Sequence, residues 1–188
     1  MKNKILLFLI FLAQIGFTQE KDEEDKEEEI GLPLLPSRSV DIDTNEGTWI
    51  SLDVHPKGDK IIFDLLGDLY EIPIQGGVAT RITEGLAFDS QPKYSPDGNS
   101  ILFLSDRSGG NNVWIINRQK KDTIQVTKGN TFKMQSADWS PDGNYIAVSK
   151  GTRNLKLHFY HREGGGGSQL ITDPENLKIS EPTFSSNG

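Results

Sequence analysis

The chain has 188 residues, 20 Lys and Arg against 27 Asp and Glu, 35% hydrophobic residues and no cysteine. The absence of cysteine excludes a disulfide-stapled scaffold, a cysteine-ligated zinc finger and a thiol enzyme. The net charge is −7, and the short group Arg118, Lys120 and Lys121 is the only basic cluster. Because nucleic-acid binding needs a basic surface that displaces counterions from phosphates, we expect no nucleic-acid partner.

The first segment, residues 1–18, is predicted to be a secretory signal peptide. Its apolar run, Ile5 to Phe17, follows two lysines, and Gly16 and Thr18 suit the −3 and −1 positions of a signal peptidase site. The run is shorter than the roughly 20 residues of a spanning helix, so we expect no membrane span after cleavage. The protein is expected to be exported to the periplasm or the exterior of a bacterium.

Residues 19–38 are predicted to be an acidic, disordered leader. Residues 20–29 carry −6 and the signal peptide carries +2, which leaves −3 of the total −7 on residues 30–188. A block of like charge cannot bury enough apolar surface to offset the entropy lost on ordering. The folded part of the chain is therefore expected to begin at residue 39 and to be nearly neutral.

An internal repeat organises that folded part. Four tetrapeptides align at spacings of 40, 45 and 45 residues: HPKG at 55–58, SPDG at 95–98, SPDG at 140–143 and SSNG at 185–188. A threonine keeps the same period, at positions 83, 127 and 172. In the tetrapeptide, Pro presets φ for the first corner of a type I turn and Gly takes the positive φ that reverses the chain. Each tetrapeptide therefore predicts a hairpin turn.

Each repeat contains four predicted strands. Apolar and polar residues alternate before the turn, and short apolar runs of the kind found in strands buried on both faces follow it: Ile61 to Phe63, Ile101 to Phe103 and Ile146 to Val148. A second pair of strands comes next, separated by Gly-rich loops: Asp68 to Pro73 with Ala79 to Thr83, Asn112 to Asn117 with Thr123 to Thr127, and Lys156 to His161 with Ser168 to Thr172. Four strands per repeat of this length are typical of a β-propeller blade.

The predicted fold is therefore all-β, an incomplete propeller of four-stranded antiparallel blades at 48–83, 84–127 and 128–172. Residues 173–188 supply the first strand of a fourth blade. Since propellers close with about four to eight blades, we expect a longer protein whose C-terminal blades complete the ring. Ser39 to Asp43, within 39–47, is the predicted ring-closing strand. With bare end faces, residues 39–188 alone are expected to aggregate or to exchange amides fast.

These motifs resemble a known family. The SPDG hairpin with its trailing Thr resembles the TolB-type, WD-like repeats of TolB, tricorn protease and propeller-bearing peptidases. One branch is more similar, the N-terminal propellers of large secreted bacterial amidohydrolases, through segments beginning at Glu46, Phe63, Phe88, Ser105 and Tyr160: EGTW, FDLLGDLY, FDSQP, SDR and YHR. The resemblance covers residues 39–188, with Lys57 and Asn187 at the usual Asp position of the turn.

The resemblance implies a parent enzyme in which the propeller precedes a metal-dependent (β/α)₈ hydrolase domain. A divalent metal, zinc by expectation, would then lie in that C-terminal domain, and this part of the chain would hold no cofactor and no catalytic residue. The residues themselves agree, because no Gly-x-Ser-x-Gly elbow followed by a helix is recognisable. The remaining C-terminal blades and catalytic domain are the expected partners.

Four polar residues are candidates for ligand contact at the channel mouth: Asp89, Gln91, Asp138 and Glu181. They lie at or near the starts of the innermost strands. The alternative is that they bond loop backbone or water, because a concave site needs several convergent groups.

Aromatic and histidine side chains are weaker candidates. The three tryptophans are expected to pack within blades rather than to form a carbohydrate platform: Trp49, Trp114 and Trp139. His55 is expected to be exposed at a turn corner. His158 and His161 are three residues apart on a strand, so they point to opposite faces and no shared metal is expected.

Three functions follow from this interpretation. The first is a non-catalytic propeller that shapes substrate access, or contacts other proteins, in a secreted metal-dependent amidohydrolase. The second is a TolB-like periplasmic scaffold that binds envelope proteins. The third is the propeller cap of a prolyl oligopeptidase-type serine peptidase.

Overall fold

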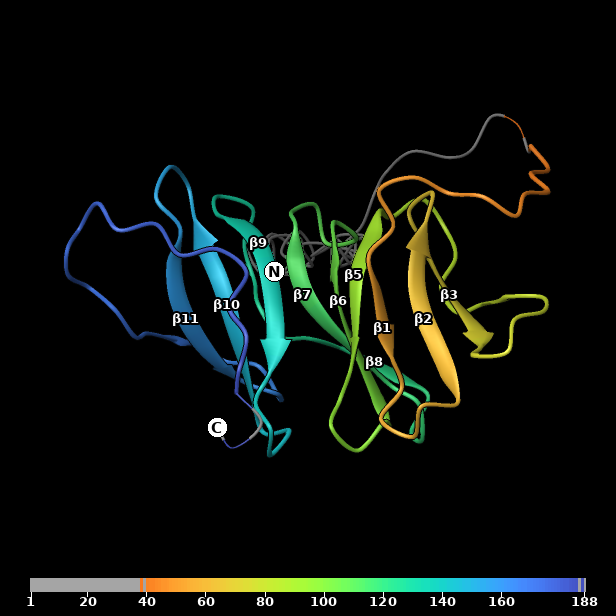
Figure 1. The fold of residues 1–188 in the computed structure, drawn as a ribbon. Coiled ribbons are helices and arrows are strands. Elements are labelled where there is room, and N and C mark those ends of the chain that lie inside the picture. The colour runs from red at the N-terminus through yellow and green to blue at the C-terminus, as the bar shows by residue number, and fades with distance from the viewer. Residues whose placement is uncertain (1–37, 39, 186, 188) are drawn as a thin grey trace, which may run out of the picture.

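The structure, a computed structural model, describes residues 38, 40–185 and 187. Within these residues it has twelve strands and no helix, arranged as three four-stranded antiparallel sheets side by side in chain order (Figure 1). The predicted all-β, incomplete propeller is confirmed. The predicted signal peptide and all but the last residue of the acidic leader lie outside the described residues. In the described part of the chain no helix is long and apolar enough to cross a membrane.

Each blade is a meander whose strands pair in chain order. Blade 1 contains β1 (Leu52–Val54), β2 (Lys60–Leu65), β3 (Asp68–Pro73) and β4 (Thr80–Arg81). Blade 2 contains β5 (Asp89–Tyr94), β6 (Ser100–Ser105), β7 (Asn112–Asn117) and β8 (Asp122–Gln125). Blade 3 contains β9 (Lys133–Trp139), β10 (Tyr145–Gly151), β11 (Lys156–His161) and β12 (Ser168–Gln169). The outermost strands are shorter than the sequence predicts, and the innermost strands β1, β5 and β9 come together with β5 between the other two.

The SPDG tetrapeptide closes the hairpin between the two inner strands of a blade. In blade 2 the Ser95 hydroxyl donates to Asp97 Oδ1 at 2.5 Å and accepts the Ser100 amide at 2.9 Å, while the Gly98 amide donates to the Ser95 carbonyl at 2.8 Å. Ser140 makes the same bonds in blade 3. The turn therefore satisfies its own backbone, and its residues have a structural role.

The repeating threonine links the last strand of a blade to the third. Thr127 Oγ1 accepts the Val113 amide at 2.9 Å, and Thr83 Oγ1 accepts the Leu69 amide at the same distance. Thr83 and Thr127 are buried, whereas Thr172 is exposed at the end of blade 3. The threonine thus accepts an amide of the third strand at a point where the outermost strand has ended and offers no backbone partner.

The core lies between blades and not within one sheet. The cluster between blades 1 and 2 contains Ile62, Leu69, Tyr94, Ile101 and Phe103. The cluster between blades 2 and 3 contains Leu102, Leu104, Val113, Ile115, Val126, Met134, Trp139, Ile146, Val148 and Tyr160. Blade 2 is covered on both sides, so β6 is buried along its whole length, as predicted. In β2 only Ile62 and Asp64 are buried, because among the described residues blade 1 has a neighbouring blade on one side only.

Two side chains differ from the sequence prediction. His55 is 8% exposed, because the turn of blade 2 packs on its ring at Gly98 and Tyr94 meets it edge-on at a centroid distance of 4.9 Å. Trp49 is 99% exposed, because it precedes β1 on a left-handed residue (φ 59°) and so lies outside the blade. The predictions of an exposed His55 and a packed Trp49 were wrong.

The two ends of the described chain carry no strand. Val40 to Gly47 pair with none of the three sheets, so ring closure by Ser39 to Asp43 stays a prediction, and Ser39 itself is not described. Residues 173–185 run beside blade 3, where the Phe184 ring lies 5.5 Å from that of Phe159. The start of the fourth blade therefore contacts blade 3 without entering a sheet.

Candidate functional site

The innermost strands wall a cavity of about 380 Å³. Its lining comes from all three blades and from the segment that follows them: Ser51, Leu52, Gln91, Pro92, Lys93, Gln135, Ser136, Ala137, Glu181, Pro182 and Thr183. In the repeat, Ser51, Gln91, Ser136 and Glu181 occupy the same position, four residues before each turn. Equivalent residues of successive blades thus line one cavity. They form part of the wall of the propeller channel.

Left-handed backbone shapes this wall at two equivalent positions. Gln91 and Glu181 both have φ 53°, and strand pairing in blade 2 shifts register between Ser90 and Lys93. Residues other than glycine in this conformation cost about 1–3 kcal/mol and persist where the surroundings hold them. The Gln91 amide is held by Asp64 Oδ2 at 2.8 Å, and the Glu181 amide is held by Ser136 Oγ at 3.0 Å.

Hydrogen bonds join the strand starts of neighbouring blades. Asp64 also accepts the Ser51 amide, through Oδ1 at 2.8 Å, so one carboxylate binds the starts of β1 and β5. The Gln91 side chain then donates from Nε2 to the Gln135 carbonyl at 3.1 Å, which reaches blade 3. These hydrogen bonds connect the three blades at the cavity mouth.

A row of charged residues lies two positions before the turns. Asp53 Oδ2 accepts the Tyr94 amide at 2.7 Å, and Asp138 Oδ2 accepts the Phe184 amide at 3.4 Å. Lys93 occupies the same position in blade 2, with Nζ 4.0 Å from Asp138 Oδ1. Burial raises the pKa of Asp53, and the Tyr94 hydrogen bond and the Lys93 charge oppose that rise only in part. The carboxylates of Asp53 and Asp138 thus connect each blade to the following repeat through a backbone amide.

The four residues predicted to contact a ligand lie in different surroundings. Gln91 and Glu181 line the cavity. Asp138 lies beside it and is engaged by Phe184 and Lys93. Asp89 is 1% exposed and bonds Arg107 at 2.6 Å, away from the cavity. Ligand contact stays a prediction for all four, with Gln91 and Glu181 the two whose side chains face the hollow.

Sequence reasoning predicted only Gln91 and Glu181 of the lining residues, and missed Gln135 and Lys93 among the others. Lys93 could have been found from the repeat, because it shares its position with Asp138. Gln135 could not, because the register of β9 with β10 shifts between Ser149 and Lys150 and leaves Gln135 unpaired in the ladder. A bulge of this kind redirects a side chain, and the repeated sequence pattern does not show where the bulge lies.

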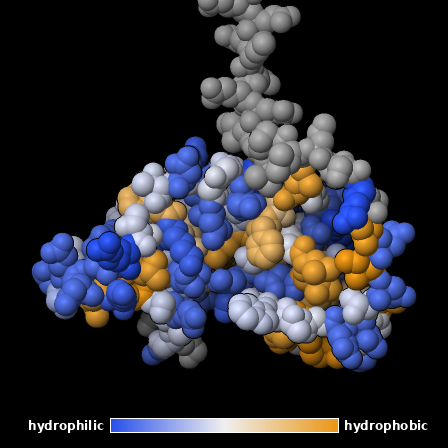
Figure 2. Space-filling model, turned by 90° about the horizontal axis from the view of Figure 1, so that it is seen from above, coloured by the Kyte–Doolittle hydropathy of each residue, from blue (hydrophilic) through white to orange (hydrophobic). Residues whose placement is uncertain are grey.

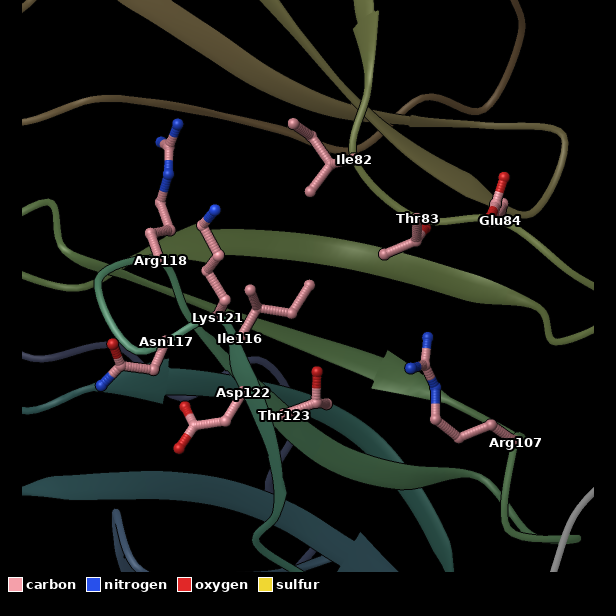
Figure 3. Close-up of a pocket in the computed structure, with 10 residues that line it drawn as sticks. All are labelled: Ile82, Thr83, Glu84, Arg107, Ile116, Asn117, Arg118, Lys121, Asp122 and Thr123. Atoms are coloured by element: carbon pink, nitrogen blue, oxygen red, sulfur yellow. The ribbon is translucent and has the colours of Figure 1, made fainter.

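A second cavity, of about 390 Å³, lies on the outer side of the junction between blades 1 and 2 (Figure 3). Arg118 and Lys121 stand at one end of it and Arg107 at the other. Both arginines are ion-paired, Arg118 to Glu71 at 2.6 Å and Arg107 to Asp89 at 2.6 Å. Because both arginines are already neutralised, the cavity between the inner strands is the better candidate site.

Among the residues that the structure describes, no three His, Asp or Glu side chains come together as a metal-binding group. His161 packs edge-on against Tyr145, and His158 stacks beside Tyr160.

Three adjacent meander blades whose innermost strands wall a common hollow define part of a β-propeller. Comparison with known families identifies which kind. Residues 24–188 match the family described as TolB beta propeller domain, and the chain belongs to that family.

Individual relatives match shorter parts of the chain. "Tricorn protease homolog 1" of Streptomyces coelicolor is 27% identical over 95 residues, which is 50% of this chain and 9% of that protein. "Tol-Pal system protein TolB" of Bordetella pertussis is 42% identical over 50 residues, 26% of this chain and 11% of that protein. The crystal structure of TolB from Acinetobacter baumannii shares the fold, with a TM-score of 0.57 and 22% identity over 66% of this chain and 33% of that one. The chain spans a minor part of each of these proteins.

Proposed function

We propose that these residues form the non-catalytic N-terminal propeller of an exported, metal-dependent amidohydrolase. In this proposal the inner-strand cavity contacts the substrate on its way to a catalytic domain beyond residue 188. The divalent metal, zinc by expectation, belongs to that domain. The observation that supports the proposal is that Gln91, Gln135 and Glu181, which come from three successive repeats, line one cavity.

The composition of the wall supports a role in substrate selection. Its polar groups are carboxamides, hydroxyls, one ammonium and one carboxylate, set among the apolar Leu52, Pro92, Ala137 and Pro182. Such a surface binds polar, largely uncharged molecules through a few placed hydrogen bonds. The nearby carboxylates of Asp53, Asp64 and Asp138 hold backbone amides of the next repeat.

The test uses the full-length protein. Hydrolysis of a panel of N-acyl amino acids and dipeptide amides is measured with zinc and after chelation by EDTA. We expect activity that EDTA abolishes and zinc restores, and a raised KM with little change in kcat for Gln91→Ala. Gln119→Ala, at an exposed turn far from the cavity, is the matched control. An unchanged KM in Gln91→Ala would contradict the proposal that the cavity contacts the substrate.

The sequence match to the tricorn protease homolog favours one second candidate, the propeller of a peptidase. Its activity would resist EDTA and would be lost on treatment with a serine-reactive fluorophosphonate. No hydrolysis with any substrate would instead favour a scaffold for envelope proteins.

A further inference from the structure

Positive and negative charges around the inner-strand cavity are unequal. Its lining contains two charged side chains, Lys93 and Glu181. Three further carboxylates lie beside the lining, where they hold backbone amides of lining residues or of their chain neighbours: Asp53, Asp64 and Asp138. Four carboxylates therefore surround the cavity against the single ammonium group of Lys93.

The two charged lining residues differ in their partners. The Glu181 side chain is exposed and makes no hydrogen bond or ion pair among the residues that the structure describes, whereas its backbone amide is held by Ser136 Oγ at 3.0 Å. Lys93 lies among acids, with Nζ 4.0 Å from Asp138 Oδ1, and its charge opposes the rise in the pKa of Asp53. A ligand in the cavity therefore meets an unpaired carboxylate and an ammonium group that is already balanced.

Two carboxamides complete the polar wall. Gln91 uses one N–H on the Gln135 carbonyl, at 3.1 Å, which leaves its own carbonyl oxygen without a partner in the described part of the chain. The half-buried Gln135 side chain makes no hydrogen bond to any described residue. A carboxamide both donates and accepts, so these groups suit the amide of a peptide-like ligand. The cavity volume, about 380 Å³, is that of a small-molecule site.

The cavity lies near a largely polar end of the propeller. Figure 2 views the end at which β1, β5 and β9 begin. Hydrophobic residues gather there on the blade 1 side, and hydrophilic residues predominate over blades 2 and 3. Because a hollow lined by one sign of charge concentrates ions of the opposite sign, cations are favoured in the cavity. A ligand carboxylate would instead be repelled by the surrounding acids.

We propose that the inner-strand cavity binds its substrate through a protonated primary amine. Glu181 contacts the ammonium group, which donates up to three hydrogen bonds, and the Gln91 and Gln135 carboxamides contact the adjoining amide. This inference rests on the proposed function and narrows its substrates to peptide-like molecules with a free amino group. Lys93 has the opposing effect, since its charge repels the ammonium group and weakens its binding.

Three ligands of similar shape and different charge test the inference. Alanyl-alanine amide carries an ammonium group, its N-acetyl derivative is neutral, and N-acetyl-alanyl-alanine carries a carboxylate. The Kd of each is measured by titration calorimetry on the full-length protein, at low salt and after chelation by EDTA. We expect alanyl-alanine amide to bind about tenfold more tightly than the other two, because a charge-assisted hydrogen bond to a carboxylate adds roughly this much.

Two substitutions in the wall should shift the Kd of alanyl-alanine amide in opposite directions. Glu181→Gln should weaken its binding about tenfold and leave the N-acetyl derivative unaffected. Gln91 has the same φ of 53° at the equivalent position, so this variant should keep its backbone. Lys93→Gln should strengthen the binding about threefold, because it removes a repelling charge. Gln119→Ala, at an exposed turn, is the control and should bind all three ligands as wild type does.

Equal affinities of the wild type for alanyl-alanine amide and its N-acetyl derivative, or an equal loss for both in Glu181→Gln, would overturn the amine site. Tighter binding of N-acetyl-alanyl-alanine would also overturn it, and would indicate that Lys93 contacts a ligand carboxylate. Zinc-dependent hydrolysis by the same protein separates the two proposals. Hydrolysis without selection for the amine refutes this inference alone, and selective binding of the amine without hydrolysis of any substrate refutes the proposed function alone.

Discussion

The main-chain amide of Gln91 donates a hydrogen bond of 2.8 Å to Oδ2 of Asp64, a buried carboxylate on the neighbouring blade. The other oxygen of Asp64 accepts the Ser51 amide, also at 2.8 Å. One side chain therefore holds the starts of two innermost strands and keeps Gln91 in its left-handed conformation. The position of the Gln91 side chain in the cavity depends on a residue that does not touch the cavity.

Replacing Asp64 is expected to loosen that end of the channel. Asp64→Ala leaves two amides without their acceptor, and each unsatisfied buried donor costs about 1–3 kcal/mol. Hydrogen exchange should therefore speed at the amides of Ser51 and Gln91 more than elsewhere in blades 1 and 2. Asp41→Asn, an exposed site, is the control and should leave both amides unchanged. Equal exchange in wild type and Asp64→Ala would show that other contacts hold the two strands.

Two glycines at the same turn position should respond differently to alanine. Gly58 and Gly98 have φ 70° and 72°, so alanine strains either backbone by about 1–2 kcal/mol. At Gly58 no atom lies near the added methyl, whereas at Gly98 the methyl would overlap the His55 imidazole of the preceding blade. Gly98→Ala should therefore destabilise by a further 1–3 kcal/mol, roughly, in urea unfolding. Equal losses would mean that the blades move apart at little cost.

The repeat predicted the blades well because the turn and the trailing threonine carry their own chemistry. Ser95, Asp97 and Gly98 satisfy one another within a few residues, so their pattern is legible in the sequence. The third strand of each blade also has its predicted bounds, as at Asn112 to Asn117. Local hydrogen bonds and alternation decide these elements, and both are visible along the chain.

The site was less predictable because it depends on contacts between blades. Asp89 has the same character as Gln91 in the sequence, but the Arg107 guanidinium, 18 residues away, pairs with it in the interior. Gln135 enters the cavity through a register shift that no residue type announces. His55 is buried by a turn that belongs to the next repeat. Each case is decided by a partner on another strand, which spacing alone does not reveal.

The trailing threonine offers a comparison within the repeat. Thr127 is fully buried, accepts the Val113 amide at 2.9 Å and donates to Asn112 Oδ1 at 3.0 Å. Thr127→Val keeps the shape and removes both bonds, so we expect a loss of about 1–3 kcal/mol in the free energy of unfolding in urea. Thr127→Ser should recover most of it. At the exposed Thr172 the same change to Val should cost little, and a comparable loss there would contradict a role for burial.

Acid sensitivity should arise at the junction of blades 1 and 2. Burial raises the pKa of Glu71, but hydrogen bonds from Arg118, Tyr94 and Lys60 outweigh it and lower the pKa from 4.5 to about 2. A lowered pKa stabilises the fold above the unfolded value, so this contribution is complete above about pH 5 and is lost as the pH falls from 4.5 towards 2. The contribution of Glu71 to the free energy of unfolding is about 1–3 kcal/mol, allowing for the partial exposure of Arg118.

Urea unfolding between pH 4.5 and 2 should show a shallower pH dependence of stability in Glu71→Gln than in wild type. Glu46→Gln, an exposed control, should retain the wild-type slope. Parallel profiles for wild type and Glu71→Gln would place the acid sensitivity in other carboxylates.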